Sequence, residues 1–498
     1  MTSHPMIPQH LGWARSAATA ALAGVLLSAC GGGGGGGGGG NPPQPPANVT
    51  ISGQITFDRI PFDTDPDQGL DPSAIVESPA RQVRVQAING ATVVTEGTTD
   101  TSGNYSLSVP SNTNVFIRAR AEMIKTGAAP TWSFTVRNNA NSNAVYAVDG
   151  AVASSGTANS TRNLRAPSGF SGNSYTGERA AAPFAILDTV FQAKQIILGA
   201  APSTDFPALG LFWSEDNKPA PGCLSEGNIE TTSYIVRGPP PLDRDCGALI
   251  EEGIYILGSV DVGGDTDEFD QSVIAHEFGH YFEDRFGRSD SIGGDHGGSA
   301  TPLDLRVAFG EGWGNAFSSI ALGNPIYRDS FNVVDDDFRI DVEADDTLNE
   351  GWFSEASVQE ILWDLFDPAN EPGDTVAIGF TPLFAAMTST TQTATEALTS
   401  IYTFSEALRA AAPASQAALG DLLDDEGIFS TDEFGAGESN NGGDPGIPGI
   451  LPVYKTIQLN IPISICSRSP AGDSSTNKLG NRVFCASSTT LHAPSPSR

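Results

Sequence analysis

The stretch SVIAHEFGHYFEDRFG, residues 272–287, contains two of the chain's 6 histidines, with Glu277 directly after the first. On a helix, His276 and His280 lie one turn apart on the same face, so both imidazoles can reach one metal ion. Glu277 is turned by about 100° and can touch a ligand of that ion without binding the ion itself. This spacing predicts a metal site.

The neighbours of these histidines predict a buried helix. Ile274, Phe278 and Phe282 recur every four residues, Tyr281 widens this apolar row, and the small Gly279 permits close packing on another side. Histidines in such a helix need partners for their ring nitrogens. Core histidines bonded to the backbone are therefore the alternative to a metal site.

A catalytic zinc site needs a third protein ligand and an open position for water. The candidates are Glu311, in AFGEGWGNAF on a helix predicted over residues 307–322, and the aspartates Asp295 and Asp304. Three glycines flank Glu311 and are unfavourable inside a helix. They indicate that the backbone approaches the histidine helix closely; they are Gly310, Gly312 and Gly314.

His276, Glu277, His280 and Glu311 together resemble the gluzincins, the thermolysin-like zinc metallopeptidases. The resemblance implies a zincin-like, mainly α (α+β) domain that binds one Zn²⁺ per chain through His276, His280 and Glu311, with Glu277 as general base. Thermolysin has an aspartate four residues after its glutamate ligand that orients a zinc histidine. Here Asn315 stands at that place, and the spacing to Glu311 is longer, so we expect a separate family within the clan.

The glycine-rich loop between the two helices contains His296. In thermolysin a histidine donates to the oxyanion of the tetrahedral intermediate, and the resemblance suggests this role for His296. A loop histidine without a special role is the alternative.

The expected function is that of a zinc endopeptidase, which hydrolyses a peptide or protein substrate with a metal-activated water. The chief alternative is a membrane-tethered binding lipoprotein whose zinc site is structural or vestigial. A zinc aminopeptidase is a third interpretation, but it needs an acidic anchor for the substrate amine, and no motif for one is evident.

The N-terminus indicates export. Residues 1–29 contain a short apolar run with the pattern of a signal peptide, and Leu27-Ser28-Ala29-Cys30 resembles the bacterial lipobox, which implies a lipid on Cys30. Residues 30–47 form a glycine- and proline-rich tether. We therefore expect a lipoprotein anchored to a bacterial membrane, at the outer membrane or cell surface.

The net charge of −33 makes nucleic acid an unfavourable partner. Two acid-rich runs, residues 62–71 and 333–346, could bind structural Ca²⁺. Neither run has the EF-hand spacing, and solvated loops are the favoured interpretation.

The chain is predicted to be multidomain. Residues 48–165 have the alternating pattern of a β-sandwich, and residues 99–107 resemble the carboxypeptidase regulatory-like sandwiches. Residues 166–434 form the zincin-like domain, with strands expected at 209–213 and 253–259 and helices at 355–367, 383–388 and 394–411. Residues 435–498 form a linker and a small β appendage.

The cysteines left after Cys30 form two local pairs, Cys223 with Cys246 and Cys466 with Cys485. Export favours two disulfides. Four cysteines could also bind zinc, but neither pair has C-x-x-C spacing.

Overall fold

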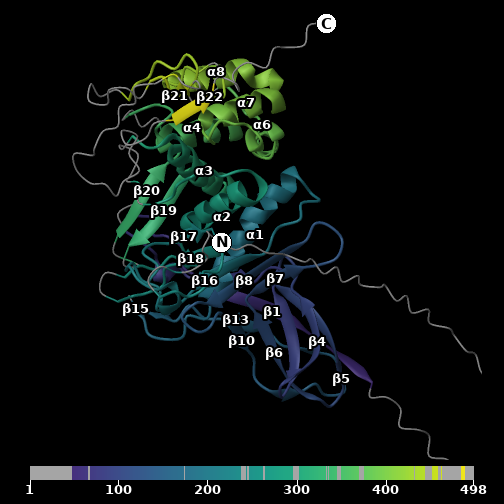
Figure 1. The fold of residues 1–498 in the computed structure, drawn as a ribbon. Helices are drawn as coiled ribbons and strands as arrows, with labels where there is room; N and C mark the ends of the chain where they lie inside the picture. The colour runs from purple at the N-terminus through teal and green to yellow at the C-terminus, as the bar shows by residue number, and fades with distance from the viewer. Residues whose placement is uncertain are drawn as a thin grey trace, which may run out of the picture. The chain divides into compact units, whose positions relative to one another are not determined.

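The computed structural model in Figure 1 describes residues 47–65, 68–172, 174–236, 243, 246–261, 264–294, 296, 302–331, 334, 336–344, 349–368, 375–430, 432–442, 451–457, 461 and 484–487. The predicted signal peptide, Cys30, Asp295 and Cys466 lie outside these ranges. Within them, none of the helices has the length and hydropathy that a membrane span requires.

The N-terminal part of the chain is rich in β-structure, as its alternating sequence predicts. In one sheet, β1 (Asn48–Arg59) pairs with β2 (Val76–Pro79), β5 (Asn104–Pro110), β12 (Ser160–Thr161) and β13 (Leu164–Ala166). The second sheet has the order β10 (Ala147–Asp149), β6 (Asn114–Arg120), β3 (Arg84–Asn89), β4 (Thr92–Thr98), with β11 (Ala153–Ser154) also on β6. Alternate residues such as Ile51, Leu107 and Ile117 are buried, so each sheet turns an apolar face to the core.

A third sheet joins strands from both sides of the predicted boundary at residue 165. Its order is β17 (Ser233–Ile235), β18 (Gly253–Ile256), β16 (Leu209–Trp213), β8 (Trp132–Asn138), β7 (Glu122–Lys125), and β9 (Ala144–Val145) pairs with β8. The predicted N-terminal sandwich, residues 48–165, includes the β8 segment, but β8 pairs in parallel with β16 instead. Alternation of side chains identifies a strand without identifying its partner.

Helix α1 (Ala182–Ala200) lies between the N-terminal and C-terminal strands of this sheet in sequence, and the other helices follow the sheet. They are α2 (Gln271–Phe286), α3 (Leu305–Leu322), α4 (Glu355–Phe366), α5 (Phe380–Met387), α6 (Thr390–Thr393), α7 (Ile401–Ala411) and α8 (Gln416–Asp425). The described part of the chain is therefore a β-rich region followed by a helical region, and one sheet contains strands from both. The single helix expected over 394–411 begins only at Ile401, where Ser400 and Thr403 form a capping box, and α8 was not predicted.

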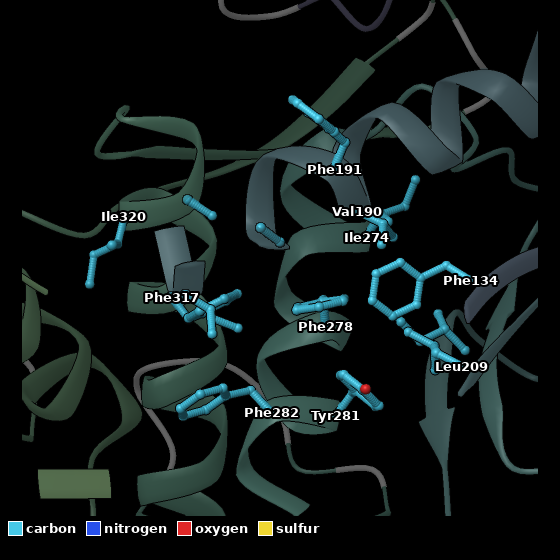
Figure 2. Packing of buried hydrophobic residues seen from close by; sticks show 14 of the residues in the cluster. Phe134, Val190, Phe191, Leu209, Ile274, Phe278, Tyr281, Phe282, Phe317 and Ile320 are labelled. Carbon is cyan, nitrogen blue, oxygen red and sulfur yellow. The ribbon is translucent and has the colours of Figure 1, made fainter. Parts of the chain in front are cut away.

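The apolar row of α2 lies in the centre of the core (Figure 2). Phe278 packs between Phe134 of β8 and Phe317 of α3, at ring-centroid distances of 6.0 and 6.1 Å. Ile274 and Phe282, the other members of the predicted row, are fully buried. This packing fixes the histidine helix against both the sheet and α3.

Two short β pairs complete the described structure, besides a small hairpin of β14 (Phe170–Ser171) and β15 (Ser174–Tyr175). The first, β19 (Ile326–Phe331) with β20 (Asp336–Asp341), contains part of the acid-rich run expected to be a loop, so that expectation was wrong for these residues. The second, β21 (Tyr454–Ile457) with β22 (Phe484–Ser487), lies in the expected β appendage.

Candidate metal centre

The side chains of His276, His280 and Glu311 converge on one point between α2 and α3. Each offers a ligand atom, and these atoms lie within 4.8 Å of one another. The two Nε2 atoms are 3.0 Å apart, and Oε2 of Glu311 lies 3.2 Å from that of His276 and 3.3 Å from that of His280. The structure thus brings the three predicted ligands together.

Glycine at position 314 allows the two helices to approach. A Cβ added at Gly314 would lie 2.6 Å from Cε1 of His276, and one at Gly279 would lie 3.2 Å from the Gly314 Cα. The expectation that all three glycines of α3 serve this approach was only partly right. Gly312 instead faces Val358 of α4, at 2.6 Å from an added Cβ, and Gly310 has ordinary space.

A chain of two amides orients His276. Its Nδ1 lies 2.8 Å from Oδ1 of Asn315, whose Nδ2 donates to Oε1 of Gln359 on α4 at 2.9 Å. Because the Asn315 amide nitrogen is committed to Gln359, its oxygen faces the imidazole, so Nδ1–H donates and Nε2 keeps a lone pair for a metal. The sequence pointed to Asn315 but gave no signal for Gln359.

Glu277 lies beside the three ligands without joining them. Its Oε2 accepts a hydrogen bond of 2.6 Å from the backbone N–H of Tyr234 on β17. Burial raises the pKa of Glu277, and His280 and His276 oppose that rise. A raised pKa makes a carboxylate a stronger base, which suits proton abstraction near neutral pH. Tyr234 was missed because its three-residue strand has no clear sequence pattern.

His296 lies at the edge of the cluster. Its Nε2 is 3.6 Å from Oε2 of Glu311, and its Nδ1 is 3.4 Å from Oε2 of Glu355 at the start of α4. The sequence suggested His296 without a motif to place it. The Glu355 carboxylate near its other nitrogen would stabilise a positive charge on the imidazole.

Of the alternative third ligands, Asp304 has a different position. It is the N-cap of α3, where its Oδ1 accepts from the backbone N–H of Arg306 at 3.1 Å, and its side chain also binds the Arg306 guanidinium. It is not part of the histidine cluster. Asp295 lies outside the described residues.

Tyr327 of β19 is a further neighbour of the cluster, and no sequence pattern predicted it. Its ring centroid lies 6.0 Å from that of His276. Burial raises the pKa of the Tyr327 hydroxyl well above its usual value, and nearby carboxylates add to this rise. Tyr327 therefore keeps its proton and remains a hydrogen-bond donor beside the cluster.

His280 and Glu311 stabilise one another's charged forms. Burial lowers the pKa of His280, but the Glu311 carboxylate outweighs it and raises that pKa to about 10. Burial acts to raise the pKa of Glu311, whereas His280 and His276 outweigh it and hold that pKa well below its usual range. Binding of a metal would displace the proton of His280, so metal affinity falls in acid.

A polar cavity lies away from the histidine cluster. It has a volume of about 310 Å³, and its lining includes Tyr146, Arg179, Trp213 and Glu215. It shares no lining residue with the histidine cluster. Its side chains form no group of candidate metal ligands among the described residues, so it is not the metal centre.

One of the two predicted disulfides is present. Cys223 and Cys246 are joined, with their Cα atoms 5.6 Å apart, which excludes both thiols as zinc ligands. Cys485 is exposed and has no disulfide bond in the described part of the chain. Its predicted partner Cys466 lies outside that part, so the second pair stays a prediction.

Comparison with known proteins adds little. No protein-family model matches the chain, and no curated protein does. A solved structure from Pseudomonas aeruginosa, described as a "putative carbohydrate binding protein", matches with 13% identity over 24% of this chain and 90% of that chain, at a TM-score of 0.16. So low a score carries no argument about fold or function.

Proposed function

We propose that this chain is a zinc-dependent endopeptidase acting on extracytoplasmic proteins. The observation that carries the proposal is the spacing of the three ligand atoms, 3.0, 3.2 and 3.3 Å. Ligands bound to a tetrahedral zinc at about 2.0–2.2 Å lie about 3.3–3.6 Å from one another, close to these separations. Two imidazoles and one carboxylate also form a ligand set that zinc hydrolases use.

A zinc ion at this site would acidify a bound water and polarise the scissile carbonyl. Glu277 would take the proton of that water on its carboxylate and pass it to the leaving amine. The N–H of Tyr234 holds one oxygen of this carboxylate and limits its rotation. His296, beside Glu311, is the proposed donor to the developing oxyanion.

The alternative is a binding lipoprotein with a structural zinc. One observation favours it: His296 lies 3.6 Å from Glu311 and could close the site as a fourth ligand. Two others favour the peptidase. His296 is not part of the three-residue ligand group, and a structural site has no use for a buried carboxylate at Glu277.

Two substitutions separate binding from chemistry. Glu277→Gln keeps the side-chain shape and removes the base, so it should retain about one zinc per chain and lose cleavage by about 10²–10⁴-fold. Glu311→Ala removes a ligand and should lose zinc and cleavage together. The measurements are zinc content by atomic absorption and cleavage of casein or a quenched peptide.

Glu215→Gln, at an exposed glutamate remote from the cluster, is the matched control and should behave as wild type. Full cleavage by Glu277→Gln would contradict the peptidase mechanism. Zinc binding without cleavage in the wild-type chain would favour the structural alternative.

Export and lipid anchoring through Cys30 belong to the same proposal and rest on the sequence alone. Cys30→Ser should block maturation or release the protein from membranes, measured by fractionation and mass spectrometry. Unchanged membrane association after this substitution would remove the lipoprotein interpretation.

A further inference from the structure

A cluster of acidic side chains lies at the N-terminal end of the histidine helix α2. Asp265 and Asp267 lie in the loop before α2, and Asp329 lies on β19. One oxygen from each of the three lies within 4.8 Å of the others. Asp270, the N-cap residue of α2, adjoins them. Burial and the charge of Asp329 raise the pKa of Asp270, and Asp270 in turn adds to the rise in the pKa of Asp267. Its hydrogen-bond contact with Asp329 instead lowers the pKa of Asp329.

Hydrogen bonding leaves this cluster incomplete. Asp267 is 3% exposed, and its Oδ2 accepts from the hydroxyl of Thr232 while its Oδ1 has no partner. Asp270 is fully buried, and its Oδ2 accepts from the backbone N–H and the hydroxyl of Ser330, each at 2.8 Å. Its Oδ1 and the Oδ1 of Asp329 likewise have no partner.

Buried carboxylate oxygens without partners are costly and call for a compensating group. No lysine or arginine forms an ion pair with these four aspartates among the described residues. Burial and the nearby Glu268 raise the pKa of Asp265 to about 6, and burial together with the charge of Asp265 raises that of Asp329 to about 7. Bound protons or a cation must therefore supply the missing positive charge.

We propose that Asp265, Asp267, Asp270 and Asp329 bind a calcium ion. Oxygen ligands at about 2.3–2.6 Å from Ca²⁺ lie at most about 5 Å apart. One oxygen each from Asp265, Asp267 and Asp329 meets this limit, at separations within 4.8 Å, and Asp270 adjoins these three. The cluster contains only oxygen donors, which suit Ca²⁺ rather than zinc. Ligands spread over a loop, a helix terminus and a strand suit the flexible geometry of Ca²⁺ better than the strict octahedron of Mg²⁺.

This site differs from the two acid-rich runs considered in the sequence. Neither run forms a group of candidate metal ligands among its described residues. The ion would instead join the start of α2 to β19, the strand that follows α3. Because β19 also carries Tyr327 next to His276, Ca²⁺ would hold together the segments around the histidine cluster. The assignment does not depend on the proposed peptidase activity.

The test is calorimetric titration of CaCl₂ into the full mature chain after chelation and dialysis. We expect about one Ca²⁺ per chain, weaker binding of Mg²⁺, and a melting temperature that rises with free Ca²⁺. Asp267→Asn and Asp329→Asn should each weaken Ca²⁺ binding by at least about tenfold while keeping the zinc content. Asp341→Asn, at an exposed aspartate of the neighbouring strand β20, is the matched control and should bind as wild type.

Glu311→Ala separates this proposal from the zinc proposal, because that variant should lose zinc and keep Ca²⁺ binding. Absence of Ca²⁺ binding by the wild-type chain would overturn the assignment, whether or not the variants fold. Wild-type Ca²⁺ affinity in Asp267→Asn and Asp329→Asn, or Mg²⁺ binding as tight as Ca²⁺ binding, would overturn it as well.

Discussion

The histidine and aspartate clusters at helix α2 differ in how many of their polar atoms have hydrogen-bond partners within the protein. In the histidine cluster, Nδ1 of His276 is hydrogen-bonded to Asn315, which is hydrogen-bonded in turn to Gln359. The carboxylate of Glu277 accepts a hydrogen bond from the backbone N–H of Tyr234. In the aspartate cluster, three Oδ1 atoms have no partner in the described structure. The first is a set of nitrogen and oxygen donors held in advance, whereas the second is a set of charges that needs a counter-ion.

The difference shows two ways in which a protein prepares a metal site. Orienting partners fix the direction of each ligand and favour a small ion with a strict geometry. Unpartnered carboxylates supply charge and leave the geometry to the ion, which suits Ca²⁺. The following predictions test this contrast, from the largest expected effect to the smallest.

The largest effect is expected for Gly314→Ala, which tests whether the histidine cluster is preformed. The added Cβ would lie 2.6 Å from the His276 ring, so the ring must turn or the helices must separate. We expect zinc affinity and cleavage to fall by more than about 10²-fold, because displacement of a ligand loses metal affinity outright. Zinc content and peptide cleavage measure the effect.

Gly310→Ala is the matched control, because its added Cβ would meet nothing closer than 3.5 Å. It should leave both zinc content and cleavage close to wild type. Equal loss in the two variants would show that helix α3 is merely sensitive to alanine, and would break the argument from close approach.

The amide chain predicts a smaller effect. Asn315→Ala removes the partner of His276 Nδ1, so zinc affinity should fall by about 10–100-fold while Ca²⁺ binding stays unchanged. Competition with a zinc chelator gives the affinity. An equal loss of Ca²⁺ binding in this variant would mean that the two clusters are not independent.

Lys194 of α1 provides a buried charge outside both clusters. It is fully buried, with Nζ 3.8 Å from the ring centroid of Trp132, and burial lowers its pKa from 10.5 to about 7, with Lys125 contributing. Between about pH 7 and pH 10 the unfolded chain therefore binds more protons at this residue than the folded chain. The contribution of Lys194 to the free energy of unfolding thus rises with pH across this window.

Lys194→Met should remove that rise, which we expect to be about 1–2 kcal/mol once the favourable contact with Trp132 is considered. Urea unfolding at pH 7 and pH 10 measures it in both chains. Added Ca²⁺ should leave this difference unchanged. A pH dependence identical in wild type and variant would contradict the assignment to Lys194.

The sequence predicted the histidine cluster well because its main elements are local. His276, Glu277 and His280 lie within two turns of one helix, whose apolar row also predicted its burial. Glu311 and Asn315 came from the resemblance, again at helical spacing. Secondary elements whose side chains repeat at 3.6 residues can be found in this way without knowledge of the fold.

The remaining parts of both clusters depend on tertiary packing. Gln359, Tyr234 and Tyr327 come from three other elements, and neither β17 nor the β19–β20 hairpin was predicted. Asp329 is far along the chain from Asp267, and only the return of β19 beside the start of α2 brings them together. The spacing of residues in a single sequence cannot predict that two such distant segments lie side by side.

The third sheet, whose strands come from both sides of residue 165, also limits how this chain can be divided into separate parts. Because β8 is hydrogen-bonded to β16, a nick near residue 165 would leave two fragments held together by a continuous ladder of backbone bonds. The N-terminal strands could not be exchanged for those of another protein by splicing at that point. A cut before β7 would not separate the parts either, because β10 to β13 follow β8 in sequence and pair with β6 and β1 of the N-terminal sheets.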